Sequence, residues 1–152
     1  IKLFADDTAG LMDALGIPKA HVLGISMGGM IAQELVLNYP EKVKKLVLCS
    51  TSCGGTKSVM PSLEVISQLI DTFDINLFQR EIARVLFTDD FIKNFPAVVE
   101  FAVQQFLKAP ISEEAFARQV SAIMEFDVYD RLSQIDVPTL IVTRKARHPP
   151  TS

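Results

Sequence analysis

One serine in this sequence lies in a motif that is typical of a catalytic nucleophile. Ser26 is at the centre of GISMGG, residues 24–29, which matches the pattern G-x-S-x-G. In that pattern a sharp turn from a strand to a helix exposes the hydroxyl, and the backbone of the serine is strained. We therefore predict a positive φ at Ser26. Because the turn is crowded, we also expect Gly24 and Gly28 to lie in close contact across it.

The helix that follows the serine would supply the second group that such chemistry requires. Met27 stands at the start of this helix, where its N–H would point at a developing oxyanion. Gly29 would let the helix pack close to the preceding strand. Two other interpretations also fit a glycine-rich turn, namely a serine that only caps the helix and a loop that binds phosphate. A phosphate loop needs Lys followed by Ser or Thr after a longer glycine spacing, and that pattern is absent from the sequence.

The elements that must position this motif follow from the apolar pattern. Short apolar runs predict buried strands near residues 21–26, 43–50 and 137–143, and helical spacing predicts helices over 4–15 and 27–38. Runs without strict alternation are typical of parallel strands that are covered on both faces. We therefore predict an α/β fold with three parallel strands in sequential order, and the two helices on opposite faces.

A long helical insert separates the second and third strands. The predicted organisation is a core over residues 1–53, a helical cap over 54–132, a return to the core over 133–143 and an irregular tail over 144–152. Capping and first-turn residues favour helices within the insert, at Pro61, Asp74, Thr88, Pro96 and Ser112.

Phenylalanine is concentrated in this insert. We expect these rings to build the core of the insert and its underside, and some of them to line an apolar pocket above Ser26 together with Met27 and Met30. The substrate side would then be apolar and uncharged. The nine phenylalanines concerned are Phe73, Phe78, Phe87, Phe91, Phe95, Phe101, Phe106, Phe116 and Phe126.

Composition excludes several classes of protein. The chain has 152 residues, of which 49% are hydrophobic, and a net charge of −3. This is too apolar for a disordered chain, and no run reaches the ~18 apolar residues of a membrane span. No basic field attracts nucleic acid. Cys49 and Cys53 cannot make a disulfide framework, which favours reduced thiols in a cytoplasmic protein, and no cluster has metal-ligand spacing. We expect no metal, cofactor, nucleic acid or membrane partner.

Neither histidine is placed to activate the serine. His21 begins the strand that ends at Ser26, so about 17 Å of extended chain separates the two. His148 lies beyond the third predicted strand, in a basic tail with no acid to orient it. A serine without a neighbouring base is a weak nucleophile.

Residues 4–51, above all HVLGISMGGMIAQELVLNYPEKVKKLVLCST, resemble the α/β-hydrolase superfamily, in its branch of cap-bearing esterases, enol-lactonases and haloperoxidase-like enzymes. The resemblance extends to about residue 143. It implies that the three strands are the fifth, sixth and seventh of that fold, with a helical cap after the sixth. It also implies Ser26 as the nucleophile and the Met27 N–H as an oxyanion donor, with Gly24, Gly28 and Gly29 as support of the nucleophile elbow.

Other parts of the family pattern have no counterpart in this sequence. The first four strands and the oxyanion loop are missing, and residues 144–148 stand where the triad acid is expected. Residues 50–55 carry no carboxylate, and the histidine that follows an eighth strand is missing. We therefore expect the middle portion of a serine hydrolase of carboxylic esters or lactones with an apolar acyl or ring group, weakly active or inactive by itself. Two alternatives remain: a catalytically dead module that binds a small ligand, and an acyltransferase that uses the same elbow.

The missing strands have a consequence for association. In the family the strand at 21–26 is central, but in this chain it would be an edge with unpaired N–H and C=O groups. We expect the isolated chain either to self-associate through this edge or to be only marginally folded. The remaining expected partner is a small apolar, ester-like substrate.

Overall fold

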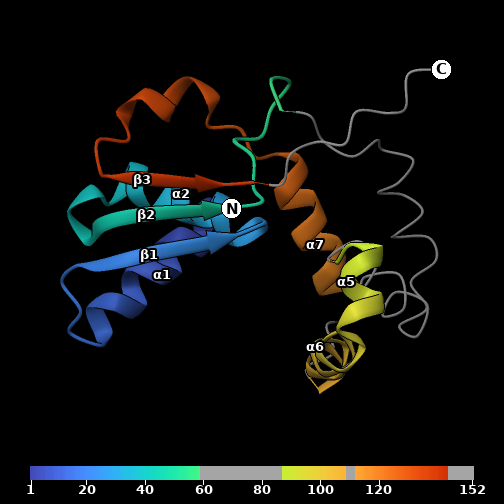
Figure 1. Cartoon of the computed structure of the whole chain (residues 1–152). Coiled ribbons are helices and arrows are strands. Elements are labelled where there is room, and N and C mark those ends of the chain that lie inside the picture. The colour runs from blue at the N-terminus through green and yellow to red at the C-terminus, as the bar shows by residue number, and fades with distance from the viewer. Residues whose placement is uncertain (59–86, 109–111, 144–152) are drawn as a thin grey trace. The chain divides into compact units, whose positions relative to one another are not determined.

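The computed structural model describes residues 1–58, 87–108 and 112–143 (Figure 1). The chain divides into two compact units. The first contains residues 1–59 and 121–152, and the second contains residues 60–120. The prediction that residues 54–132 form a cap over the candidate site remains a prediction.

A three-stranded parallel sheet forms the centre of the first unit. Its strands are β1 (Ala20–Ile25), β2 (Val43–Cys49) and β3 (Thr139–Val142), in the spatial order β1-β2-β3. Both pairs of strands are parallel. The predicted strands and their sequential order are thus confirmed, with boundaries that differ by no more than two residues.

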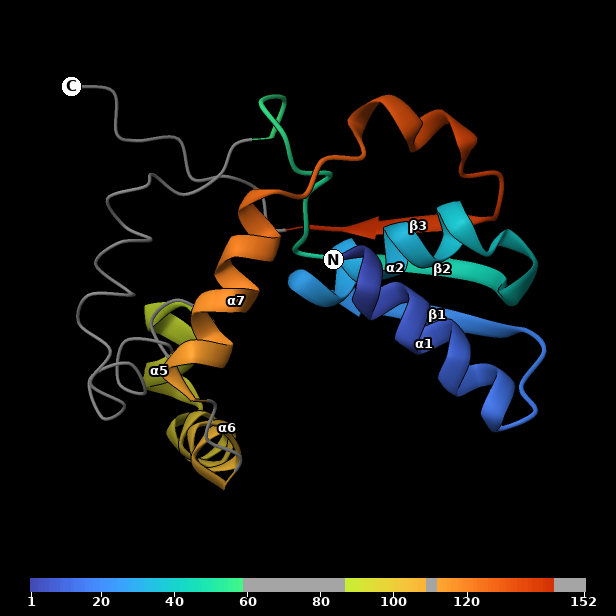
Figure 2. The ribbon, with the colours of Figure 1, turned by 180° about the vertical axis from the view of Figure 1, so that it is seen from behind.

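Two helices cover one face of this sheet. They are α1 (Lys2–Ala14) and α2 (Met27–Asn38), and both lie on the same side of the strands (Figure 2). The prediction of opposite faces was wrong. The rule of right-handed crossovers fixes α2, which connects two parallel strands, but not α1, which only precedes the first of them. Ala5 and Ala9 let α1 approach α2 closely, and the Tyr39 hydroxyl donates to Asp6 Oδ1 at 2.9 Å.

The main core lies between these helices and the sheet. Burial alternates along β2 from Leu46 to Cys49, with Leu46 and Leu48 buried in the core against the helices. On the opposite side, Leu23 and Ile25 of β1 are each 61% exposed and Leu140 of β3 is 58% exposed. The expected cover on both faces is therefore absent from the described part of this unit. The buried residues of the core are Ala5, Ala9, Ala32, Leu35, Val36, Val43, Leu46 and Leu48.

A second buried cluster joins the chain before and after the insert. Met30 of α2 packs with Phe126 and Val128, and Gly54 forms an antiparallel bridge with Asp127. The 3-10 helix η2 (Tyr129–Gln134) then leads to β3. The expectation that Met30 lines a substrate pocket was wrong, because its side chain is 6% exposed and belongs to this core.

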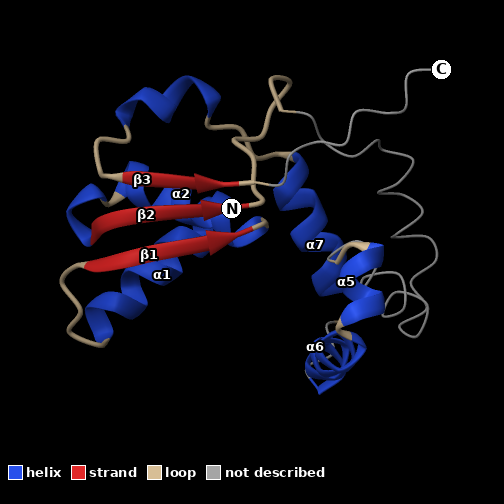
Figure 3. Cartoon of the chain, in the orientation of Figure 1, coloured by secondary structure: helices blue, strands red, loops and turns tan. Residues whose placement is uncertain are grey.

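The described part of the insert is mainly helical (Figure 3). It contains α5 (Asp89–Asn94) and α6 (Pro96–Lys108) in the second unit, and α7 (Glu113–Met124), which runs from the second unit into the first. Thr88 caps α5, since its Oγ1 accepts from the Phe91 N–H at 3.2 Å. Ser112 Oγ accepts from the Ala115 N–H at 3.2 Å. These start signals are confirmed, whereas Pro61 and Asp74 lie outside the described residues.

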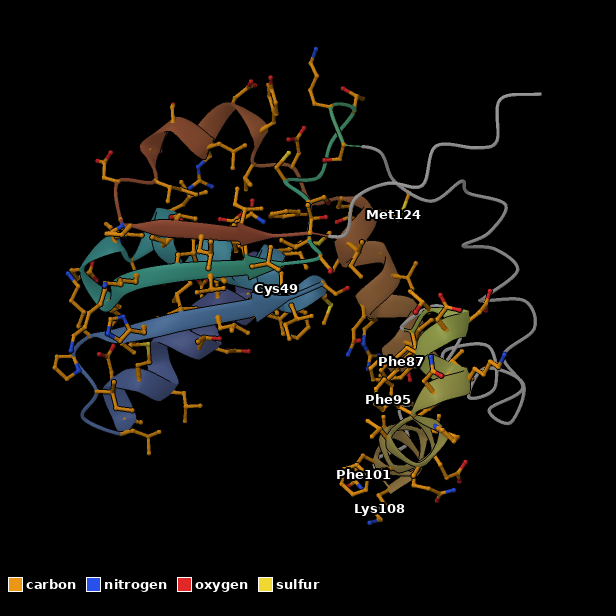
Figure 4. The ribbon with its side chains drawn as sticks, viewed as in Figure 1. Cys49, Phe87, Phe95, Phe101, Lys108 and Met124 are labelled. Atoms are coloured by element: carbon orange, nitrogen blue, oxygen red, sulfur yellow. The ribbon has the colours of Figure 1, made fainter. Side chains whose placement is uncertain are left out.

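Phenylalanine rings contact one another along α5. The Phe87 and Phe91 ring centroids are 5.1 Å apart, and those of Phe91 and Phe95 are 4.9 Å apart. Phe87 and Phe95 stand at the two ends of α5, and Phe101 on α6 is 66% exposed (Figure 4). The side chains of Phe73, Phe78 and Phe106 lie outside the described part of the structure. Within that part, no helix is both long and apolar enough to span a membrane.

Candidate active site

Ser26 occupies the turn between β1 and α2 with a strained backbone. Its φ is 52° and its ψ is −124°, which confirms the predicted positive φ. Such a conformation costs about 1–3 kcal/mol for a residue with a Cβ, so the surrounding structure must enforce it. The serine is exposed, and no side chain in the described residues accepts a hydrogen bond from its hydroxyl.

Hydrogen bonds to its N–H and to its carbonyl hold the serine in place. The Ser26 N–H donates to the Cys49 carbonyl at 3.0 Å, at the end of β2. The Ser26 carbonyl accepts from the Gly29 N–H at 2.9 Å and from the Thr51 hydroxyl at 2.7 Å. The turn is thereby fastened both to the neighbouring strand and to the first turn of its own helix.

The three glycines of the motif have different environments. A Cβ on Gly24 would lie 2.4 Å from the Gly28 carbonyl oxygen, so no side chain fits at Gly24. The predicted close contact between Gly24 and Gly28 is thus confirmed, although a Cβ on Gly28 itself would meet no atom within 4 Å. A Cβ on Gly29 would lie 2.5–2.6 Å from side-chain atoms of Thr51. Gly29 thus makes room for the loop after β2.

The Met27 N–H is available for an acceptor outside the helix. Met27 is the first residue of α2, and the first N–H groups of a helix have no intrahelical partner. The positive end of the helix dipole lies at the same point. A negative oxygen next to Ser26 would therefore be stabilised by the Met27 N–H and by the positive end of the helix dipole.

The described residues place no base beside the serine. His21 is exposed near the start of β1, whereas Ser26 follows the end of that strand. Five residues of strand correspond to about 17 Å, far beyond a hydrogen bond. His148 lies outside the described residues. Of the two histidines considered from the sequence, His21 is therefore not brought to Ser26.

Two further polar residues near strand ends were not anticipated. Ser50 has a φ of 45° and its N–H donates to the Val142 carbonyl at 2.9 Å, which ties the end of β2 to the end of β3. The Asp127 side chain lies beside the loop after β2, because a Cβ on Gly55 would lie 2.1 Å from the Asp127 Oδ2. That loop has no carboxylate of its own. The feature of the sequence that could have indicated this approach is the pair Gly54-Gly55. Both glycines adopt a positive φ, and Phe126 and Asp127 lie against them.

Comparisons with known proteins agree with this geometry. A family model for the alpha/beta hydrolase fold matches residues 2–144. The 3-oxoadipate enol-lactonase 2 of Acinetobacter baylyi is 29% identical over 136 residues, which cover 90% of this chain and 49% of that protein. The 2-hydroxy-6-oxononadienedioate/2-hydroxy-6-oxononatrienedioate hydrolase of Burkholderia vietnamiensis is 31% identical over 140 residues, which cover 88% of this chain and 48% of that protein.

Solved structures show the same likeness. The enol-lactonase from Burkholderia xenovorans LB400 superposes with a TM-score of 0.73 at 25% identity, covering 91% of this chain and 52% of that one. The chain spans about half the length of the curated relatives it matches. On the strength of the family match over nearly its whole length, the chain belongs to the α/β-hydrolase fold family.

Proposed function

We propose that Ser26 is the nucleophile of a serine hydrolase that acts on a carboxylic ester or lactone through an acyl-enzyme. The observation that carries the proposal is the exposed serine with a φ of 52° at the junction of β1 and α2. This is the conformation that a nucleophile elbow requires. The family match over residues 2–144 supports the same chemistry.

In the proposed reaction, the Ser26 Oγ attacks the carbonyl carbon of the substrate. The negative oxygen that forms accepts a hydrogen bond from the Met27 N–H at the start of α2. The bond from the carbonyl carbon to the leaving oxygen then breaks, and this oxygen takes the proton that a base has removed from Oγ, which releases an alcohol or opens the ring of a lactone. Water then hydrolyses the ester formed on Ser26 and restores its hydroxyl. A base must take the proton from Oγ. In the family pattern this base is a histidine that follows an eighth strand, a part of the pattern without a counterpart in this sequence, and no cofactor takes part.

The substrate class is inferred from two features. A relative from Acinetobacter baylyi and the solved structure from Burkholderia xenovorans LB400 are both named enol-lactonases. The exposed side chains Leu23 and Ile25 on β1, together with Phe101 on α6, give both units apolar surface. An apolar acyl or ring group is therefore the proposed specificity. A helical cap over residues 54–132 and a cytoplasmic location belong to the same proposal.

A fluorophosphonate probe tests the role of Ser26 directly, because it phosphonylates only a serine with nucleophilic character. We expect slow labelling of the parent chain, with the adduct located on Ser26 by mass spectrometry. Ser26→Ala should abolish this labelling.

Ser50→Ala is the matched control. Ser50 is also an exposed serine with a positive φ at the end of a strand, so its replacement should leave the labelling of Ser26 unchanged. An unlabelled parent, or equal labelling of the parent and Ser26→Ala, would contradict the proposal and favour a module that only binds a ligand. Hydrolysis of p-nitrophenyl acetate by Ser26→Ala at the parent rate would also contradict it.

A further inference from the structure

The carbonyl group of Ser26 has a partner that does not belong to the strand-turn-helix motif. The Thr51 Oγ1 donates to this carbonyl oxygen at 2.7 Å, from a position 25 residues further along the chain. The other strong donor to the same oxygen is the Gly29 N–H at 2.9 Å, which is part of the normal start of α2. The side chain of Thr51 thus contacts the strained Ser26 from outside the turn that contains Ser26.

The packing around Thr51 fixes the direction from which its hydroxyl arrives. A Cβ on Gly29 would lie 2.5 Å from the Thr51 Cβ, 2.6 Å from its Cγ2 and 2.6 Å from its Oγ1. The whole side chain therefore lies against the bare face of Gly29. In this position its methyl group touches the helix while its hydroxyl points at the Ser26 carbonyl.

Gln33 holds the next residue of the same loop. Its side chain is buried, with 2% of the residue exposed. Its Nε2 donates to the Ser52 carbonyl at 2.9 Å and to the Gly29 carbonyl at 3.2 Å. Because a buried amide that lost these acceptors would be left unsatisfied, Gln33 strongly favours one placement of residues 51–52.

Strain at Ser26 explains why such a clamp is needed. A φ of 52° persists only where neighbouring contacts outweigh its cost. The N–H of Ser26 is held by the Cys49 carbonyl, and its carbonyl is held by Thr51. The orientation of one peptide group on each side of Ser26 is therefore determined by residues of β2 and of the loop after it. The same peptide group that carries the Ser26 carbonyl also carries the Met27 N–H.

We propose that Thr51 and Gln33 are positioning residues that hold the Ser26–Met27 peptide group in the orientation needed for nucleophilic attack and for donation to an oxyanion. Thr51 acts through its hydrogen bond to the Ser26 carbonyl, and Gln33 acts by fixing the loop that carries Thr51. The inference rests on the proposed role of Ser26, but the geometry of the clamp can be tested without any activity.

The first test is made by NMR on the intact chain with Thr51→Val, which keeps the shape of the side chain and removes the donor. We expect the ¹³C resonance of the Ser26 carbonyl to shift, and the Gly29 and Ser26 amides to exchange about two- to tenfold faster, as the loss of one hydrogen bond predicts. Thr51→Ser retains the hydroxyl and should restore both readouts. Gln33→Met should change them in the same direction as Thr51→Val.

Thr8→Val is the matched control. The Thr8 hydroxyl also donates to a backbone carbonyl, that of Phe4 at 2.7 Å, but on α1. A general loss of stability would act equally in the two valine variants, whereas the clamp predicts changes at Ser26 and Gly29 only in Thr51→Val. Identical exchange and carbonyl shifts at Ser26 in both variants would overturn the inference.

Labelling by the fluorophosphonate probe forms the second arm. If Ser26 reacts in the parent, Thr51→Val should slow the reaction and Thr51→Ser should restore it, while Thr8→Val leaves it unchanged. Equal labelling rates in Thr51→Val and the parent would overturn the inference. If the parent does not react at all, the proposed function fails, and the NMR arm still decides whether the clamp exists.

Discussion

The Gly24 Cα faces the backbone of Gly28 so closely that a Cβ there would lie 2.4 Å from the Gly28 carbonyl oxygen. The reverse does not hold, since a Cβ on Gly28 would meet no atom within 4 Å. We therefore expect Gly24→Ala to lower the free energy of unfolding by at least about 2 kcal/mol, as overpacking does. Gly28→Ala should leave it unchanged or raise it by up to about 1 kcal/mol, because alanine favours a helix over glycine. Urea unfolding measures both, and equal losses in the two variants would contradict the assignment.

A polar cluster joins η2 to α2. Arg131 Nη1 donates to Glu34 Oε2 at 3.1 Å and its Nη2 donates to Asn38 Oδ1 at 3.0 Å. The Glu34 side chain is only 12% exposed. Arg131→Met would leave this carboxylate without its cationic partner, and we expect a loss of about 1–3 kcal/mol in the free energy of unfolding.

Arg118→Met is the control for this prediction. Arg118 pairs with Glu114 four residues earlier on α7, and both side chains are mostly exposed. Exposed pairs of this kind contribute about 0.5 kcal/mol or less. In urea unfolding, Arg118→Met should therefore lose less free energy of unfolding than Arg131→Met. An equally large loss in Arg118→Met would contradict the importance of burial.

Asp6 provides a test of pH dependence. Hydrogen bonds from Lys2 and then from Tyr39 lower the pKa of its carboxyl group below the ordinary value. A lowered folded-state pKa means that the ionised carboxylate stabilises the fold above the unfolded-state pKa. This contribution is lost as the pH falls through the folded-state pKa. Tyr39→Phe removes one donor, so the Asp6 pKa measured by NMR titration should move back towards the ordinary value. An unchanged pKa would show that Lys2 alone sets it.

Among the described residues β1 pairs with β2 alone, and its other edge predicts an association. We propose that a second copy of the chain pairs antiparallel with this edge. Leu23 and Ile25 are each 61% exposed there, and residues 21–26 contain no Lys, Arg, Asp or Glu that would be placed opposite a like charge. Light scattering coupled to size exclusion should therefore detect a dimer or larger species.

A charge on the edge should prevent this association. Leu23→Lys is expected to give a monomer. Ile141→Lys places the same charge on β3, the strand at the opposite edge of the sheet, and this variant should still associate. A monomeric parent with a steep, cooperative urea transition would contradict the proposal. Loss of association in both lysine variants would assign it to a different surface.

Much of the fold could be predicted from local pattern. The apolar runs around Leu23, Leu46 and Ile141 define the three strands, and the motif at Ser26 predicts its positive φ. The side of the sheet on which α1 lies could not be predicted, because a helix that precedes the first strand is not constrained by crossover handedness.

The residues that support the candidate site could not be predicted from the local sequence either. Thr51 and Gln33 look like ordinary loop and helix residues, and their importance follows from hydrogen bonds that span 25 and 19 residues. Nothing in the sequence around Ser50 indicates a positive φ, since serine seldom adopts one. The contact between Gly55 and Asp127 likewise depends on how the chain returns after the insert.

The separation in sequence of the paired strands has a consequence for folding. Val43 of β2 pairs with Ala20 after one short crossover, whereas Leu46 pairs with Thr139 only across the whole insert. The second loop is roughly four times longer, and its closure costs about 1 kcal/mol more in chain entropy. The β1-α2-β2 segment, which carries Ser26, is therefore expected to assemble first, and β3 to join last and to detach first. The serine turn would then form early, while Ser50, whose N–H is bound to Val142, would be set only when β3 has docked.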